Sequence, residues 1–270
     1  MTTRNFTAAL VFAVFLTGEE LNAQARKARA VRPPPSADSL IAITNRGRFL
    51  AEHDSVAWLG AGAMTSLSLP EDGIRRLIAR RTSIGWEVAA GSLAENGNVY
   101  LMTHLSTPGI EAGPQWASTW YDPPRSDTGY FARAARAIES AVTMFRRPAD
   151  RPYIATAVPA ADGPWWWVYL YPAPSRPGAW PRGGDMRFRV SADGRIITES
   201  RHLHQTIAEY TPRTARSGAE AEQEVLSDTP EDTDVFHVVQ RRPALPELMT
   251  AGRYRYRIDV NGTIRLIGRK

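Results

Sequence analysis

Two stretches of the chain place apolar residues at the three- and four-residue spacing of an amphipathic helix. The first begins near Ser36 or Asp38, either of which can cap a helix, and Gly60 and Gly62 are expected to end it. Its apolar stripe comprises Leu40, Ile43, Gly47, Leu50, Ala57 and Ala61. One face of this helix is therefore predicted to pack against the rest of the domain.

The second helix is predicted between Asp127, which can cap it, and Pro148, which stops it. A single apolar stripe runs along this segment from Phe131 to Phe145, and arginines lie outside the stripe. Residues 106–129 are rich in Pro, Gly, Ser and Asp, so we expect a long loop there.

Elsewhere, alternation of apolar and polar residues predicts strands. They are expected at 75–80, 85–90, 99–105, 153–158, 165–171, 185–191, 195–207, 234–241 and 253–267, the last with a turn inside. Asn96-Gly97 between two of them favours a hairpin turn, because both residues tolerate positive φ. We therefore expect one α+β domain over residues 37–270, a mostly antiparallel β-sheet packed against two main helices. Residues 211–233 include many acidic and few apolar residues. This composition predicts a mobile loop within the domain.

Residues 1–25 have the pattern of a secretory signal peptide. Arg4 opens a basic start, an apolar run extends from Phe6 to Leu16, and Ala23-Gln24-Ala25 supplies the small residues of a cleavage site. The apolar run is too short to cross ~30 Å of hydrocarbon as a stable helix. We expect a cleaved signal peptide, a Pro-rich extended linker over residues 26–36, and an exported protein that is periplasmic or secreted.

The composition excludes covalent links through cysteine and argues against some classes of partner. The chain has no cysteine, so disulfides and a lipid-modified cysteine are excluded. Its net charge is +5, and 31 of its 33 basic residues are arginine, because only Lys27 and Lys270 are lysines. These arginines are scattered along the sequence, so we expect no nucleic-acid partner. We also expect no membrane span after signal cleavage, because no later segment is long and apolar enough.

Residues 165–171 are the most unusual segment, because they read Trp-Trp-Trp-Val-Tyr-Leu-Tyr. Strand alternation puts one row of aromatic side chains on a single face: Trp165, Trp167, Tyr169 and Tyr171. This aromatic row could stack on sugar rings or flat ligands, or it could belong to a central strand covered on both faces. The turn-rich connection that follows, residues 172–184, is of a kind that often borders a pocket.

Histidines provide the one candidate metal site. His202 and His204 are two residues apart on a predicted strand, so they would share a face, and His237 could be a third ligand. Three imidazoles with an open fourth position would hold a hydrolytic zinc ion, with Glu199 or Asp234 as base. The alternative is that these histidines bond to backbone, solvent or a neighbouring side chain.

Four acidic residues cluster near the end of the predicted loop: Asp228, Glu231, Asp232 and Asp234. They lack the regular spacing of a calcium-binding loop. We therefore interpret this cluster as a solvated acidic segment.

Two segments resemble a family of exported bacterial proteins that has no known activity. They are the run from Trp165 to Ile207 and the later run DTPEDTDVFHVVQRRP, which ends near Pro243. The resemblance implies export and transfers no catalytic residue. Members of that family also carry a His-x-His pair just before the acidic segment. Here that place reads Glu222-Gln223-Glu224, which weakens the metal interpretation.

The functional prediction is an exported, soluble protein of the bacterial envelope with a non-catalytic binding or structural role. It follows from the export pattern and from the lack of a nucleophile elbow, a phosphate loop or a catalytic cysteine in the sequence. The partner would be an envelope protein, a glycan or a hydrophobic small molecule, and no cofactor is expected. The alternative is a metal-assisted hydrolase that uses zinc at the His-x-His site.

Overall fold

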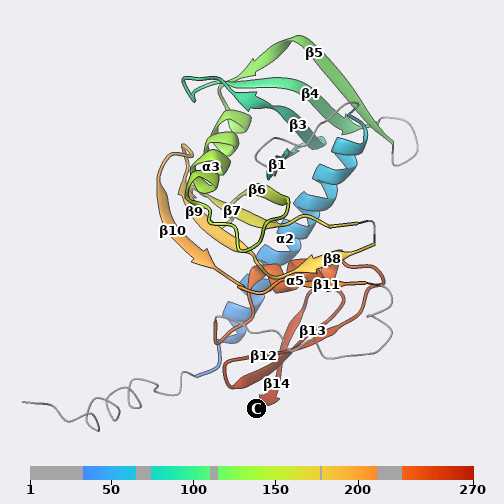
Figure 1. Ribbon diagram of the computed structural model, residues 1–270, viewed down its shortest axis with the longest axis vertical. Coiled ribbons are helices and arrows are strands. Elements are labelled where there is room, and N and C mark those ends of the chain that lie inside the picture. Colours follow the sequence, from blue (N-terminus) through green and yellow to red (C-terminus); the bar gives the residue numbers. More distant parts are fainter. Residues whose placement is uncertain (1–32, 65–73, 110–114, 177, 212–226) are drawn as a thin grey trace, which may run out of the picture. The chain divides into compact units, whose positions relative to one another are not determined.

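The structure is a computed structural model that describes residues 33–64, 74–109, 115–176, 178–211 and 227–270 (Figure 1). Over these ranges the chain forms three helices and 14 strands, and its sheets are mostly antiparallel. The predicted α+β class is therefore confirmed. The predicted signal peptide, most of the linker and residues 212–226 of the acidic loop lie outside the described residues. No helix within the described ranges is long and apolar enough to cross a membrane.

A five-stranded sheet in the order β1-β6-β7-β9-β10 carries the main core. Its strands are β1 Ile74–Arg76, β6 Tyr153–Pro159, β7 Trp165–Pro172, β9 Met186–Ser191 and β10 Ile197–His202. β1 runs parallel to β6, and the other neighbours pair antiparallel. β6 and β7 are buried along nearly their whole length, which explains why both read as continuous apolar runs in the sequence.

One face of this sheet is covered by α3, Tyr130–Met144 (Figure 1). Its buried stripe packs in one cluster with Trp166, Val168 and Leu170 of β7. Asp127 Oδ1 accepts hydrogen bonds from the backbone N–H groups of Gly129 and Ala132, so it caps the helix as predicted. The helix ends before Pro148, also as predicted.

The opposite face is covered by α2, Ala37–Gly62, where Leu50 and Ala51 pack with Trp167 of β7. Ser36 Oγ accepts a hydrogen bond from the Ser39 N–H at its start, and Gly62 is its last residue. Both predicted helices are therefore present with the predicted caps. The central sheet is sandwiched between them, which explains the mixed apolar and polar pattern of each helix.

A four-stranded antiparallel meander lies beside the N-terminal part of α3. Its strands are β2 Ile78–Thr82, β3 Gly85–Leu93, β4 Tyr100–Pro108 and β5 Trp116–Asp127. Asn96-Gly97 lies in the β3–β4 turn, and Gly97 has φ +66°, as the hairpin prediction requires. The prediction of a loop over 106–129 is wrong, because β5 fills half of this range and β4 extends into it as far as Pro108. β5 is an edge strand that is mostly exposed, so backbone pairing with β4 forms it without any apolar periodicity.

The C-terminal part contains α5, Asp232–Gln240, and the sheet β12 Glu247–Ala251, β13 Tyr254–Ile258 and β14 Ile264–Arg269. The prediction of a strand over 234–241 is wrong, because this apolar run forms the helix α5. Glu231 and Asp234 form a capping box at the start of that helix. α5 packs against α2 and this sheet in one apolar cluster. The strand observed in the range 195–207 is shorter than predicted, because β10 ends at His202. The next strand, β11 Ala208–Tyr210, pairs with β8, Trp180–Arg182, in a separate two-stranded sheet.

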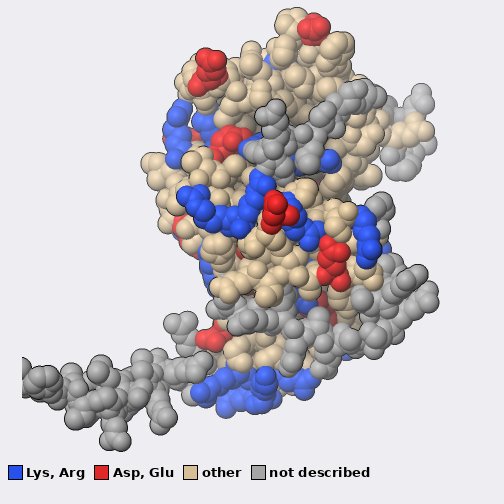
Figure 2. All heavy atoms as spheres, viewed as in Figure 1, with Lys and Arg blue, Asp and Glu red and all other residues tan. Residues whose placement is uncertain are grey.

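The arginines that look scattered in the sequence gather in part on the C-terminal sheet, as Figure 2 shows. Exposed positions alternate with buried ones along β13, and they carry Arg255 and Arg257. Arg265 and Arg269 lie on the exposed part of β14. Pairing of the two strands therefore brings Arg255, Arg257 and Arg265 onto one surface, and Asp259 neutralises it in part through ion pairs with Arg257 and Arg265. Arg269 lies opposite Tyr254 instead, with its guanidinium 5.6 Å from the centre of that ring.

Candidate functional site

The aromatic row of β7 is part of the core. Trp167, Tyr169 and Tyr171 are 8%, 0% and 2% exposed, and they pack with Leu50 of α2 and Phe236 of α5. Trp165 is half-buried, and the Arg189 guanidinium lies 3.9 Å from the centre of its ring. The row is therefore no open stacking platform, because helices cover both faces of the strand that carries it.

The three candidate histidines do not meet at one point. β10 ends at His202, which is exposed, and the chain then bends so that His204 is fully buried. His204 Nδ1 and His237 Nε2 each lie 3.1 Å from Asp185 Oδ2. His204 Nε2 lies 3.1 Å from Asp234 Oδ1. The prediction that His202 and His204 share a strand face is thus corrected, since the strand ends between them.

The environment of His204 favours its charged form. Burial alone would lower the pKa of His204, but the charges and hydrogen bonds of Asp234 and Asp185 raise it to about 10. Against the effect of burial, His237 and His204 hold the pKa of Asp185 well below its usual range, and His204 with Arg182 does the same for Asp234. An imidazolium has no free lone pair for a metal ion. In the described part of the chain, no group of three or more His, Cys, Asp or Glu side chains has the arrangement of a metal site.

The acidic cluster at the start of α5 is buried rather than solvated, which corrects that interpretation for Glu231, Asp232 and Asp234. Asp232 accepts a hydrogen bond from the Tyr169 hydroxyl at 2.8 Å and forms ion pairs with Arg187 at 2.6 Å and Arg46 at 2.9 Å. Glu231 pairs with Arg201 at 2.6 Å. Buried carboxylates need such partners, and here these are arginines from β9, α2 and β10.

A second buried group of charges adjoins His204. Arg182 of β8 forms ion pairs with Asp234 at 3.2 Å and with Glu247 of β12, and Glu247 also pairs with Arg241 at 2.9 Å. These side chains connect β8 with α5 and the C-terminal sheet. Of the residues that the sequence offered as metal ligands or bases, His204, His237 and Asp234 thus belong to buried ion-paired groups, Glu199 pairs with Arg187 at 3.2 Å, and His202 is exposed.

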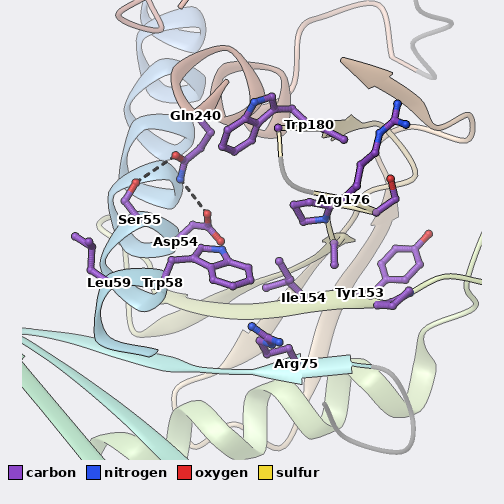
Figure 3. Close-up of a pocket in the computed structure, with 16 residues that line it drawn as sticks. Asp54, Ser55, Trp58, Leu59, Arg75, Tyr153, Ile154, Arg176, Trp180 and Gln240 are labelled. Carbon is purple, nitrogen blue, oxygen red and sulfur yellow. Dashed lines mark hydrogen bonds between the residues drawn. The ribbon is translucent and has the colours of Figure 1, made fainter. Parts of the chain in front are cut away.

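The candidate site is a pocket between α2, β6 and the connection from β7 to β8 (Figure 3). Its volume is about 860 Å³, within the range of small-molecule binding sites. Trp58 of α2 and Trp180 of β8 reach into it from opposite sides, and Ile154 and Tyr153 of β6 form its floor. Residues 173–176 and 178–180 border it, and they belong to the turn-rich segment 172–184.

Asp54 is the polar group at the inner end of this pocket. It is 7% exposed, its Oδ1 accepts a hydrogen bond from the Tyr171 hydroxyl at 2.5 Å, and its Oδ2 accepts one from Gln240 Nε2 at 2.9 Å. The Trp58 indole donates a further hydrogen bond. Burial raises the pKa of Asp54 to about 6, although these hydrogen bonds and His237 act in the opposite direction.

Two arginines line the same pocket. Arg75 of β1 lies with its guanidinium 4.9 Å from the centre of the Trp58 ring, and Arg176 is exposed in the β7–β8 connection. Neither forms an ion pair with a carboxylate of the described residues. Glu209, which experiences the charge of Arg176, is itself paired with Arg151 at 3.0 Å. Among the described residues that line the pocket, these two guanidiniums are the only Lys or Arg side chains.

Sequence reasoning did not single out Asp54, Arg75 or Arg176. Trp58 and Trp180 resemble ordinary packing residues when they are read in sequence. No local signal connects these positions, because the pocket assembles them from four separate parts of the chain: α2, β1, the β7–β8 connection and β8. Comparison with known proteins matches this chain to no family model, no curated protein and no solved structure.

Proposed function

We propose that this protein is an exported binding protein without catalytic activity, whose pocket takes a small aromatic molecule that carries an anionic group. The observation that carries this proposal is the pocket of about 860 Å³ between Trp58 and Trp180. A cavity of this size and largely apolar lining suits a ligand of drug-like dimensions. Of the three partner classes expected from the sequence, the pocket favours the hydrophobic small molecule.

The arginines in the pocket supply the selectivity for an anion. A guanidinium binds a carboxylate or sulfonate through charge-assisted hydrogen bonds, and Arg75 is already oriented by its contact with Trp58. Aromatic walls contribute stacking and desolvation. The ligand is thus expected to combine a flat apolar body with a negative group at Arg75 and Arg176.

Export is supported by the sequence of residues 1–25, with its basic start, short apolar run and Ala23-Gln24-Ala25 site. The resemblance of Trp165–Ile207 to exported bacterial proteins points the same way. A binding protein outside the cytoplasm would meet its ligand in the envelope or the medium.

The binding function is tested with 2-naphthoate, an aromatic carboxylate, by calorimetry and by quenching of tryptophan fluorescence. We expect one site per chain, and Trp180→Ala and Arg176→Gln should each weaken binding by about 10-fold or more. Arg133→Gln, on the exposed side of α3, is the matched control and should bind like the unaltered protein. Absence of binding, or equal binding by all three variants, would contradict the proposal.

A further inference from the structure

The inner end of the pocket differs from its mouth in charge. Behind Trp58, a small hollow of about 40 Å³ extends the pocket toward α5. Asp54 lies where the pocket meets this inner hollow, and Tyr171, Trp180 and Phe236 form aromatic walls around it. The hollow has room for a group as small as an ammonium ion or for one or two water molecules.

Among the described residues, the carboxylate of Asp54 has hydrogen-bond donors but forms no ion pair, and the one charge that acts on it, His237, is itself paired with Asp185. Its donors are the Tyr171 hydroxyl, the Gln240 amide and the Trp58 indole, all of them uncharged. This contrasts with Asp232 and Asp234, which are buried to a similar degree and are both paired with arginine. A buried charge without a counter-ion is costly, so a cation supplied by a ligand would stabilise the site.

Building on the proposed function, we infer that the inner hollow is a subsite for an ammonium group, and that the natural ligand is an aromatic amine with an acidic group at its other end. The amine lies at Asp54, the aromatic body lies between Trp58 and Trp180, and the anionic group lies at Arg75 and Arg176. The aromatic walls add a cation–π attraction to the ion pair. The charges of such a ligand complement those of the pocket at both ends.

The charged and titratable groups around Asp54 come from several elements. His237 and Gln240 face it from α5 and Tyr171 from β7, whereas Arg75 of β1 lines the outer pocket beside the Trp58 ring. His237 Nε2 is engaged by the Asp185 carboxylate at 3.1 Å. The pKa of Asp54, raised to about 6 by burial, leaves its carboxylate mostly ionised at pH 8 and mostly protonated at pH 5. Amine binding should therefore weaken as the pH falls through 6.

The experiment uses matched probes on one ring system: 2-naphthoate, 6-(hydroxymethyl)-2-naphthoate and 6-(aminomethyl)-2-naphthoate. At pH 8 we expect the aminomethyl probe to bind about 10- to 100-fold more tightly than the hydroxymethyl probe. Asp54→Asn should abolish this preference while 2-naphthoate still binds. Glu52→Gln removes the same charge from the exposed side of the same helix and should keep the preference.

Each outcome decides a different point. Binding of 2-naphthoate without a preference for the amine would overturn the ammonium subsite and leave the proposed function standing. A preference that survives in Asp54→Asn would also overturn it, because the amine would then bind elsewhere. If Asp54→Asn does not fold, the unaltered protein still provides the test: an amine preference equal at pH 8 and pH 5 contradicts the inference.

Discussion

At the scale of single residues, burial and pairing decide what each polar side chain can do. Asp54, Asp185 and Asp234 are all buried, yet they differ in their neighbours. His237 and His204 hold the pKa of Asp185 low, and His204 with Arg182 holds that of Asp234 low. Asp54 has uncharged donors instead, and its pKa is raised to about 6. Aspartates that are buried to a similar degree thus differ in pKa because their neighbours differ.

His204 should make stability depend on pH above neutrality. Its pKa rises from 6.5 to about 10 on folding, so the folded state holds a proton that the unfolded chain has lost between these values. This stabilisation is complete below about pH 6.5 and is lost as the pH rises toward 10. We expect the free energy of unfolding to fall by about 2–3 kcal/mol between pH 7 and pH 9.5, measured by urea denaturation.

His202→Gln is the matched control for this measurement, because His202 is exposed two residues away. It should leave the pH profile unchanged, whereas His204→Gln should flatten it. A flat profile in the unaltered protein would show that His204 is not an imidazolium between its two carboxylates.

At the scale of elements, the contact between α2 and α5 depends on a glycine. A Cβ atom added at Gly47 would lie 2.4 Å from the Asp232 carbonyl oxygen and 2.5 Å from Val235 Cβ. Such distances are far below van der Waals contact, and the carbonyl belongs to backbone that cannot easily move. The two helices therefore approach each other closely because residue 47 has no side chain.

Gly47→Ala should destabilise the protein by about 2 kcal/mol or more, although alanine favours the helical conformation. Gly62→Ala is the control, because a Cβ atom there meets nothing within 4 Å. That variant should be neutral or slightly more stable. Denaturation midpoints of the two variants provide the measurement, and equal midpoints would mean that α5 does not pack on α2 at this position.

At the scale of the whole molecule, the buried ion pairs of Arg182 connect β8 with α5 and β12. Through them β8, α5 and the C-terminal sheet share one polar contact region beside the pocket. The exposed arginines of β13 and β14 add a basic surface to the same part of the protein (Figure 2).

The proposed export predicts the residue at which the mature chain begins. When the protein is produced in a bacterial host, the chain recovered from the envelope or medium should begin at Arg26, as intact mass and N-terminal sequencing would show. Ala25→Lys should block processing, because signal peptidase requires a small residue there. Recovery of the unprocessed chain from the cytoplasm would contradict export.

The sequence by itself determined the elements whose information is local. The stripes of α2 and α3, their caps at Ser36 and Asp127, and the Asn96-Gly97 turn follow from side-chain periodicity and from residues that favour helix starts or positive φ. β6, β7 and β9 were predictable for the same reason.

Only the tertiary structure decided which element covers which face. The periodicity of a sequence shows that one face of a helix or strand is apolar, but it does not show which other element packs on that face. It could not reveal, therefore, that α2 and α5 bury the aromatic row of β7. It could not identify β5 either, which forms through backbone pairing alone. The pocket brings Asp54, Arg75, Tyr153, Arg176 and Trp180 together from distant parts of the chain. Their common site depends on packing over long sequence separations, which no local pattern encodes.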